Sequence, residues 1–116
     1  MLINPPIAKA FIKIRSIDFR KGMDSLIGFV NQILMQDPRS GAAFVFKNAS
    51  STGIKILYYD GQGFWLCHKR LSKGKLMHWP KSESETLSVN SQELFVVLFD
   101  GDISGVRFRP VFQKIA

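Results

Sequence analysis

The feature that most constrains this sequence is an Asp60-Gly61 pair between two runs rich in β-branched and aromatic residues. Asp-Gly readily adopts the positive φ angles of a two-residue hairpin turn, so the flanking runs are expected to pair as antiparallel strands. With such a turn, Ile56 and Trp65 share one face of the sheet, and Leu57 lies on the other. Both faces are then largely apolar, and two helices would cover one face well and the other only partly.

A second turn is predicted at residues 72–74, and positive charge surrounds it. Four of the seven residues from 69 to 75 are Lys or Arg, and the whole chain has a formal net charge of +7. Such an excess favours a polyanionic partner. The alternative is that the charge maintains solubility and protects a strand edge from aggregation. The candidate DNA-binding residues are Arg20, Lys21, Lys69, Arg70, Lys73 and Lys75.

A helix is predicted after a first strand at residues 7–14, where Lys9 and Lys13 interrupt an apolar run and suggest one water-facing side. Asp18 is the expected N-cap of this helix. The helix is expected to end before Asp37-Pro38, because proline disfavours a helical residue before it. Its buried stripe has three- and four-residue spacing and comprises Met23, Leu26, Ile27, Val30 and Leu34.

The predicted fold class is α+β: a single antiparallel sheet of four to five strands, packed by one long helix after the first strand, plus a short C-terminal helix. Residues 43–47 form a further short strand, and residues 79–85 a surface loop. The C-terminal helix begins with a capping box, Asn90 to Glu93, and ends at Gly101. The chain, 1–116, is predicted to be a single domain. The tail, about 103–116, fits either an edge strand or a flexible basic arm.

The sequence does not favour an enzyme. Cys67 is the only cysteine, which excludes an intramolecular disulfide and a Cys-rich zinc site. His68 and His78 have neither helical i, i+4 spacing nor a carboxylate close in sequence, and no glycine-rich phosphate-binding motif is complete. We therefore predict no catalytic residues, no metal and no cofactor, with a metal-dependent nuclease as the least favoured alternative. No stretch approaches the ~18 apolar residues of a membrane helix, so a cytoplasmic protein is expected.

The aromatic residues of the hairpin have two interpretations. Packing in the core is the ordinary role of such side chains. Exposed aromatic rings could instead stack on unpaired bases or anchor a partner protein. The candidate partner-binding residues are Tyr59, Phe64 and Trp65.

Several blocks of the sequence together resemble one family. They are DFRKGMDSL at 18–26, DPRSG at 37–41, FVFKN at 44–48, IKILYYDGQGF at 54–64, KRL at 69–71 and WP at 79–80. They resemble the TnpB accessory protein, the product of the second open reading frame of the insertion-sequence-sixty-six group of bacterial transposable elements. The resemblance implies a non-catalytic protein that is encoded beside a separate transposase and assists transposition.

Charge and resemblance together predict two partners. One is DNA, contacted at its phosphate backbone with weak sequence specificity. The other is the transposase of the same element. The alternative hypothesis is a protein adaptor that docks on the transposase without contacting DNA. The resemblance supplies no catalytic residues.

Overall fold

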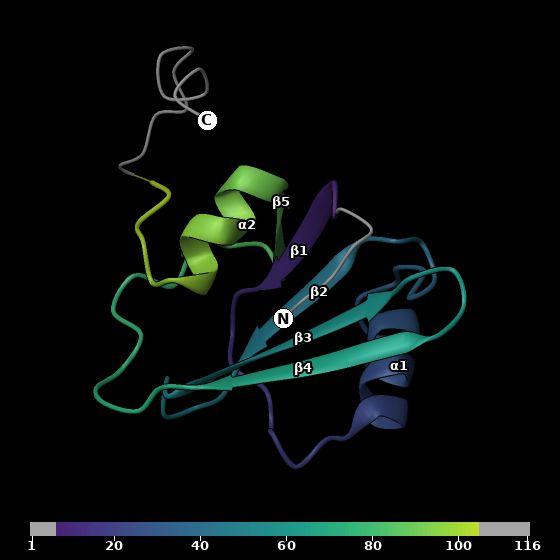
Figure 1. Cartoon of the computed structure of the whole chain (residues 1–116), viewed down its shortest axis with the longest axis horizontal. Helices are drawn as coiled ribbons and strands as arrows, with labels where there is room; N and C mark the ends of the chain where they lie inside the picture. Colours follow the sequence, from purple (N-terminus) through teal and green to yellow (C-terminus); the bar gives the residue numbers. More distant parts are fainter. Residues whose placement is uncertain (1–6, 105–116) are drawn as a thin grey trace.

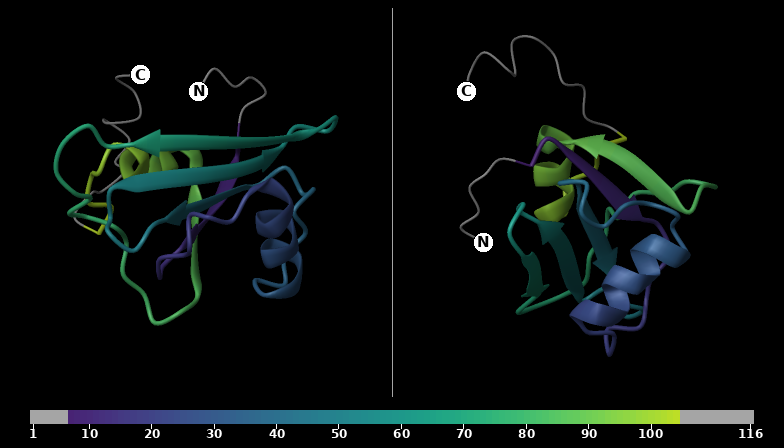
Figure 2. Two further views of the ribbon diagram at one scale, coloured as in Figure 1. Left: turned by 90° about the horizontal axis from the view of Figure 1, so that it is seen from below. Right: turned by 90° about the vertical axis from the view of Figure 1, so that its right-hand side faces the viewer.

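The computed structural model describes residues 7–104, which form one five-stranded sheet with a helix against each face (Figure 1, Figure 2). The strand order is β4-β3-β2-β1-β5. The elements in chain order are β1 (Lys9–Lys13), α1 (Met23–Gln32), β2 (Ala43–Lys47), β3 (Gly53–Tyr59), β4 (Phe64–Arg70), β5 (Thr86–Asn90) and α2 (Ser91–Leu98).

The sheet is mixed, which corrects the prediction of a purely antiparallel sheet. β1 and β2 run parallel, with Ala10 opposite Ala43, and the other three pairs of strands are antiparallel. The parallel pair arises because α1 lies between the two strands in the chain and serves as a crossover connection. β1 is an interior strand, so Lys13 is buried and pairs with Glu85 at 3.0 Å, where one water-facing side was expected.

The fifth strand, β5, lies in a stretch for which no strand was predicted. It pairs with β1 along its whole length, with Phe11 opposite Ser88. Only Leu87 and Val89 are apolar among its five residues, so its alternating pattern is too short to stand out in the sequence.

Each face of the sheet has its own hydrophobic core. On one face, Leu26 and Val30 of α1 pack against side chains of β2 and β3 such as Phe44 and Leu57. On the other, Leu94 and Val97 of α2 pack against residues of β1, β2 and β3, including Ile12, Val45 and Ile56. The alternation predicted for the hairpin is confirmed. Ile54, Ile56, Tyr58 and Cys67 belong to the core under α2, and Leu57, Phe64 and Leu66 to the core under α1.

The hairpin turn lies one residue later in the chain than predicted. Tyr59 pairs with Phe64, and the Asp60 N–H donates to the Gly63 carbonyl at 3.0 Å. Residues 61–62 are therefore the two loop residues, and φ at Gly61 is 96°. The strand pairing is shifted by two residues from the predicted one, so each side chain keeps its predicted face.

The expected role of Asp18 as a helix cap is wrong. α1 begins after Gly22, whose position has no side-chain cap, and Asp18 bonds to Arg20 instead. The capping box of α2 is confirmed. The Asn90 side chain accepts from the Glu93 N–H at 2.8 Å, and the Glu93 carboxylate accepts from the Asn90 N–H at 3.0 Å.

The end of α2 requires two special residues. Asp100, with φ of 61°, takes the left-handed position that was predicted for Gly101. Gly101 donates its N–H to the Val96 carbonyl at 2.7 Å, and a Cβ on it would lie 2.5 Å from Val96 Cγ1. The glycine is therefore needed for close approach to the helix, while the aspartate makes the turn.

Most of the predicted tail, 103–116, lies outside the described residues, as does its suggested edge strand. No helix within residues 7–104 is both long enough and apolar enough to cross a membrane.

Candidate nucleic-acid interface

The basic loop, residues 70–75, begins at the last residue of β4, and its backbone is fixed near both ends. Leu71 and Leu76 donate their backbone N–H groups to carbonyl oxygens of residues 51–52, at 2.8 and 2.7 Å. The Leu76 side chain is buried in the core under α2. Gly74, with φ of 76°, makes the predicted turn between these anchors. The loop therefore presents its lysines from a backbone that is already ordered.

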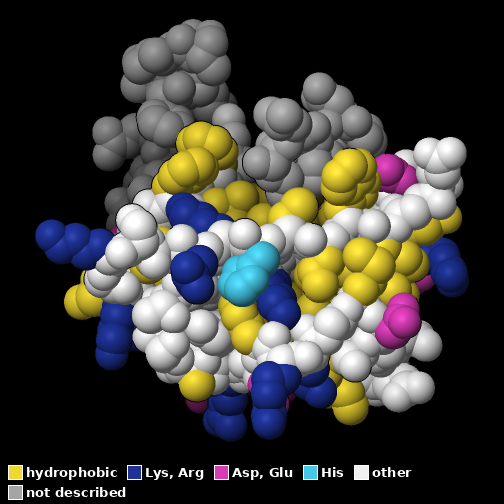
Figure 3. Space-filling view, turned by 60° about the horizontal axis from the view of Figure 1, so that its bottom comes forward, with side chains coloured by type: hydrophobic (Ala, Val, Ile, Leu, Met, Phe, Trp, Pro, Cys, Tyr) yellow, Lys and Arg dark blue, Asp and Glu magenta, His cyan; other side chains and the backbone are white. Residues whose placement is uncertain are grey.

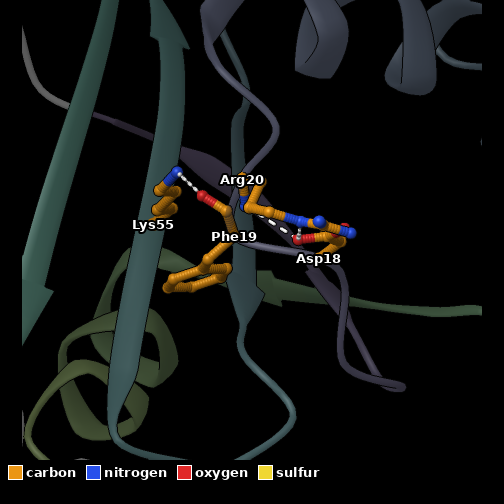
Figure 4. Close-up of polar contacts among 4 residues, drawn as sticks. All are labelled: Asp18, Phe19, Arg20 and Lys55. Carbon is orange, nitrogen blue, oxygen red and sulfur yellow. Dashed lines mark hydrogen bonds and ion pairs between the residues drawn. The ribbon is translucent and has the colours of Figure 1, made fainter.

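The second basic segment, residues 18–21, is held against the sheet by a buried lysine. Lys55 of β3 is only 8% exposed, and its Nζ donates to the Phe19 carbonyl oxygen at 2.7 Å (Figure 4) and to the Lys21 carbonyl oxygen at 3.0 Å. The same ammonium lies 4.9 Å from the centre of the Phe19 ring. The ring also packs edge-on against His68 of β4, with centroids 5.3 Å apart. Charge-assisted hydrogen bonds of this kind fix the course of the segment.

The two basic segments therefore lie at the same end of the β3–β4 hairpin. Lys55 and His68 are partners in the register, and Arg70 faces Gly53 at the end where the basic loop begins. On the face shown in Figure 3, Lys and Arg side chains are much more frequent than Asp and Glu. Glu83 and Glu85 precede β5, at the opposite edge of the sheet. We call the end of the hairpin that carries segment 18–21 and the basic loop the basic side of the molecule.

Arg20 is neutralised by a neighbour. Its guanidinium makes a two-pronged contact with the Asp18 carboxylate, with Nε and Nη2 donating at 3.0 and 2.7 Å to Oδ2. These side-chain hydrogen bonds, together with one from the Arg20 backbone N–H, lower the pKa of Asp18 from 3.8 to about 2. The same pairing raises the pKa of Arg20. Its charge is therefore less available to a phosphate than the sequence suggested.

Lys69 is also engaged within the protein. Its Nζ donates to the Leu98 carbonyl at 2.6 Å and lies 4.4 Å from the centre of the Phe99 ring. A cation is favourable at this position because the carbonyl groups at a helix C-terminus carry partial negative charge. Lys69 therefore fastens β4 to the end of α2.

The remaining predicted cations are available to solvent. Arg70, Lys73 and Lys75 are exposed, and none of their charged groups makes a hydrogen bond or an ion pair within the described part of the chain. Lys21 is half-buried, and its ammonium lies 6.0 Å from the centre of the Phe29 ring. The six candidate residues thus fall into three groups. The free cations are Arg70, Lys73 and Lys75, the ring-bound cation is Lys21, and the pinned cations are Arg20 and Lys69.

The candidate partner-binding aromatics do not form one surface. Tyr59 and Phe64 pack with their rings tilted by 56° and their centroids 4.8 Å apart, and the Arg39 guanidinium lies within 6 Å of both ring centres. Trp65 points to the opposite face of the sheet and is 49% exposed. Its indole Nε1 donates to the Asp60 carboxylate at 2.8 Å, the largest contribution to the lowered pKa of Asp60.

Two groups of residues that shape this region were not predicted from the sequence. Lys55 was assigned to an apolar face without a role, although a lysine inside a buried strand is itself a signal of a paired ammonium. Phe95 and Phe99 were assigned to the C-terminal helix without regard to exposure. Phe95 lies on α2 and Phe99 is the C-cap residue directly after it, so their four-residue spacing places them side by side on the surface, with ring centroids 4.8 Å apart.

Together these features define a small α+β protein with a basic side and, within the described residues, no cluster of three metal-ligating side chains. The chain belongs to the family described as "IS66 Orf2 like protein", whose profile matches residues 8–107. This confirms the family resemblance seen in the sequence. The family is a transposition-associated accessory one and is not a known catalytic family.

Two curated relatives span nearly the whole chain. The uncharacterized protein y4hO of Sinorhizobium fredii is 31% identical over 109 residues, which cover 94% of this chain and 90% of the relative. The uncharacterized protein y4jC of the same organism is 29% identical over 103 residues, which cover 89% of this chain and 87% of the relative. No solved structure matches the chain at a significant level.

Proposed function

We propose that this protein assists DNA transposition by binding the phosphate backbone of DNA through the basic loop. The observation that carries the proposal is the availability of three cations, Arg70, Lys73 and Lys75, on a loop that is anchored at both ends. A loop ordered before binding loses less conformational entropy when it meets a partner. Family membership supports a role at DNA, because transposition proceeds on a nucleoprotein complex.

The expected contact is with phosphates and not with base edges. Lysine acts as a point charge toward phosphate, and such contacts position a protein without selecting a sequence. Lys21 lies at the same end of the hairpin and extends the basic side. Arg20 and Lys69 contribute less, because each already has an internal partner.

Fluorescence anisotropy with two labelled duplexes of equal length tests this proposal. One duplex carries the end of the element, and the other carries the same bases in scrambled order. We expect both to bind within about threefold of each other, because phosphate contacts carry no sequence information. Three phosphate contacts predict a slope of log K against log salt of about −3. Absence of binding at low salt, or a slope near zero, contradicts the proposal.

Docking on the transposase without DNA is the second candidate function, and the exposed Trp65 favours it. Large exposed aromatic side chains are common anchors of protein interfaces. The test is a pull-down with purified transposase after nuclease treatment. Retention by the wild-type protein and loss with Trp65→Ala supports docking. Equal recovery of both proteins removes Trp65 from the interface.

A further inference from the structure

A groove of about 680 Å³ runs between β4 and α2, away from the basic loop's lysines. Ile56, Cys67 and Leu98 contribute apolar lining, and Phe95 and Phe99 flank it. The two phenylalanines are 66% and 65% exposed, which is unusual for neighbouring aromatic rings on a small protein. The groove therefore offers apolar surface that nothing within residues 7–104 covers.

One side of the groove is a sheet edge with unused backbone groups. Among the strands of residues 7–104, β4 pairs only with β3, and the Asp60–Gly63 hydrogen bond fixes which residues face inward. By the alternation of an antiparallel ladder, the N–H and C=O groups of every second residue of β4 point outward. None of these outward groups has a backbone partner within the described chain. They belong to Phe64, Leu66, His68 and Arg70.

The side chains around this edge differ between the two faces of the sheet. Cys67 lies on the face of α2, beside the exposed phenylalanines. The side chains of His68 and Arg70 lie on the opposite face, and no carboxylate of residues 7–104 lines the groove. Successive side chains of a strand point to opposite faces. An added strand that alternates apolar and acidic residues would place its apolar side chains in the groove and its carboxylates beside Arg70.

We propose that the β4–α2 groove binds an extended segment of another protein, in which apolar and acidic residues alternate, as a sixth strand on β4. Backbone hydrogen bonds to the edge supply affinity, and alternating side chains supply selectivity, as in other cases of strand addition. Charge complementarity selects the occupant, because a basic segment would meet Arg70 and Lys69. This inference does not depend on DNA binding, and the groove adjoins the proposed DNA-binding surface only at Arg70.

A labelled heptapeptide of alternating valine and aspartate, which matches the seven residues of β4, is the probe for this site. Fluorescence anisotropy with the full chain should show saturable binding. A valine–lysine heptapeptide and hepta-aspartate should each bind at least about tenfold more weakly, because each lacks one of the two required features. On addition of the valine–aspartate peptide, hydrogen exchange at the His68 and Arg70 amides should slow.

The matched variants are Phe95→Ser with Phe99→Ser, and Ile33→Ser as the control. Ile33 follows α1 and is 61% exposed, so its replacement removes exposed apolar surface away from the groove. Loss of at least about tenfold in peptide affinity is expected only in the phenylalanine variant. Circular dichroism checks its fold, and its DNA affinity should equal that of the wild type.

Four results would overturn the inference. Equal binding of hepta-aspartate would leave only a general anion surface, and equal peptide affinity of the phenylalanine variant would exclude the groove. A wild-type dimer in sedimentation that becomes monomeric in this variant would assign the groove to a second copy of the chain. Loss of DNA affinity in the variant would assign it to nucleic acid.

Discussion

Segment 18–21 and the basic loop, 70–75, lie at the same end of the β3–β4 hairpin, yet they hold their charges differently. In the first segment, Arg20 is paired with Asp18, and the backbone is fixed by a buried lysine. In the second, main-chain hydrogen bonds fix the backbone, and the charged groups of Arg70 and two lysines have no partner among residues 7–104. Local charge density therefore does not tell which cations can meet a partner. Whether a cation already has a partner within the fold decides whether it can bind another molecule.

The largest expected effect comes from Lys55→Met, which removes the anchor of segment 18–21. Two carbonyl oxygens lose a charged donor in a nearly buried site, so the free energy of unfolding should fall by about 3 kcal/mol. Urea denaturation measures this change. Lys73→Met removes an exposed lysine of the basic loop, so it is the control and should lower the free energy of unfolding little. Equal stability of the two variants would mean that Lys55 does not hold the segment.

Gly74→Ala should destabilise the protein at the basic loop, with a smaller effect than Lys55→Met. A side chain at φ of 76° is strained even though no atom lies within 4 Å of the added Cβ, and the cost is about 1–2 kcal/mol. Gly63→Ala is the matched control, because its surroundings are equally open and its φ is not in the left-handed region. Thermal or urea unfolding that fails to separate the two variants would contradict the strained turn.

Asp18→Asn removes the carboxylate partner of Arg20 and tests whether Arg20 can then contribute to DNA binding. The freed guanidinium adds a cation to the basic side, so DNA affinity at low salt should rise by about threefold. Asp24→Asn removes the same negative charge from the first turn of α1 and is the control. If DNA affinity rises equally in both variants, the change in net charge explains the effect, and the release of Arg20 does not.

The smallest expected effect concerns pH. Because the folded-state pKa of Asp18 is depressed from 3.8 to about 2, its pairing with Arg20 stabilises the fold above pH 3.8 and is lost as pH falls through about 2. NMR titration of the Asp18 carboxyl group should give a midpoint near pH 2. Arg20→Ala should raise this midpoint toward 3.8, and an unchanged midpoint would show that another group lowers it.

Local patterns in the sequence predicted the hairpin, the alternation of its two faces, the turn at Gly74 and the capping box at Asn90. Each depends on residues close in sequence, where turn chemistry and periodicity act directly. β5 and the parallel pairing of β1 with β2 could not be predicted in this way. The strand has two apolar residues, and its pairing depends on contacts with a segment more than seventy residues away.

The candidate interface was predicted in composition but not in detail. Clusters of Lys and Arg identified the basic loop and segment 18–21, and the structure brings them to one end of the hairpin. The pairing of Arg20 with Asp18 depends on a local turn where a helix cap was expected. The pinning of Lys69 depends on the position of α2, which no local pattern specifies.

The most direct test compares the free cations with the pinned ones at equal loss of charge. Lys73→Gln with Lys75→Gln removes two free cations, and Arg20→Gln with Lys69→Gln removes two pinned ones. Duplex DNA binding is measured for both over a range of salt concentrations. We expect the first variant to make the salt slope shallower by about 2 and the second to leave it nearly unchanged. Equal slopes for the two variants would contradict a special role of the free cations.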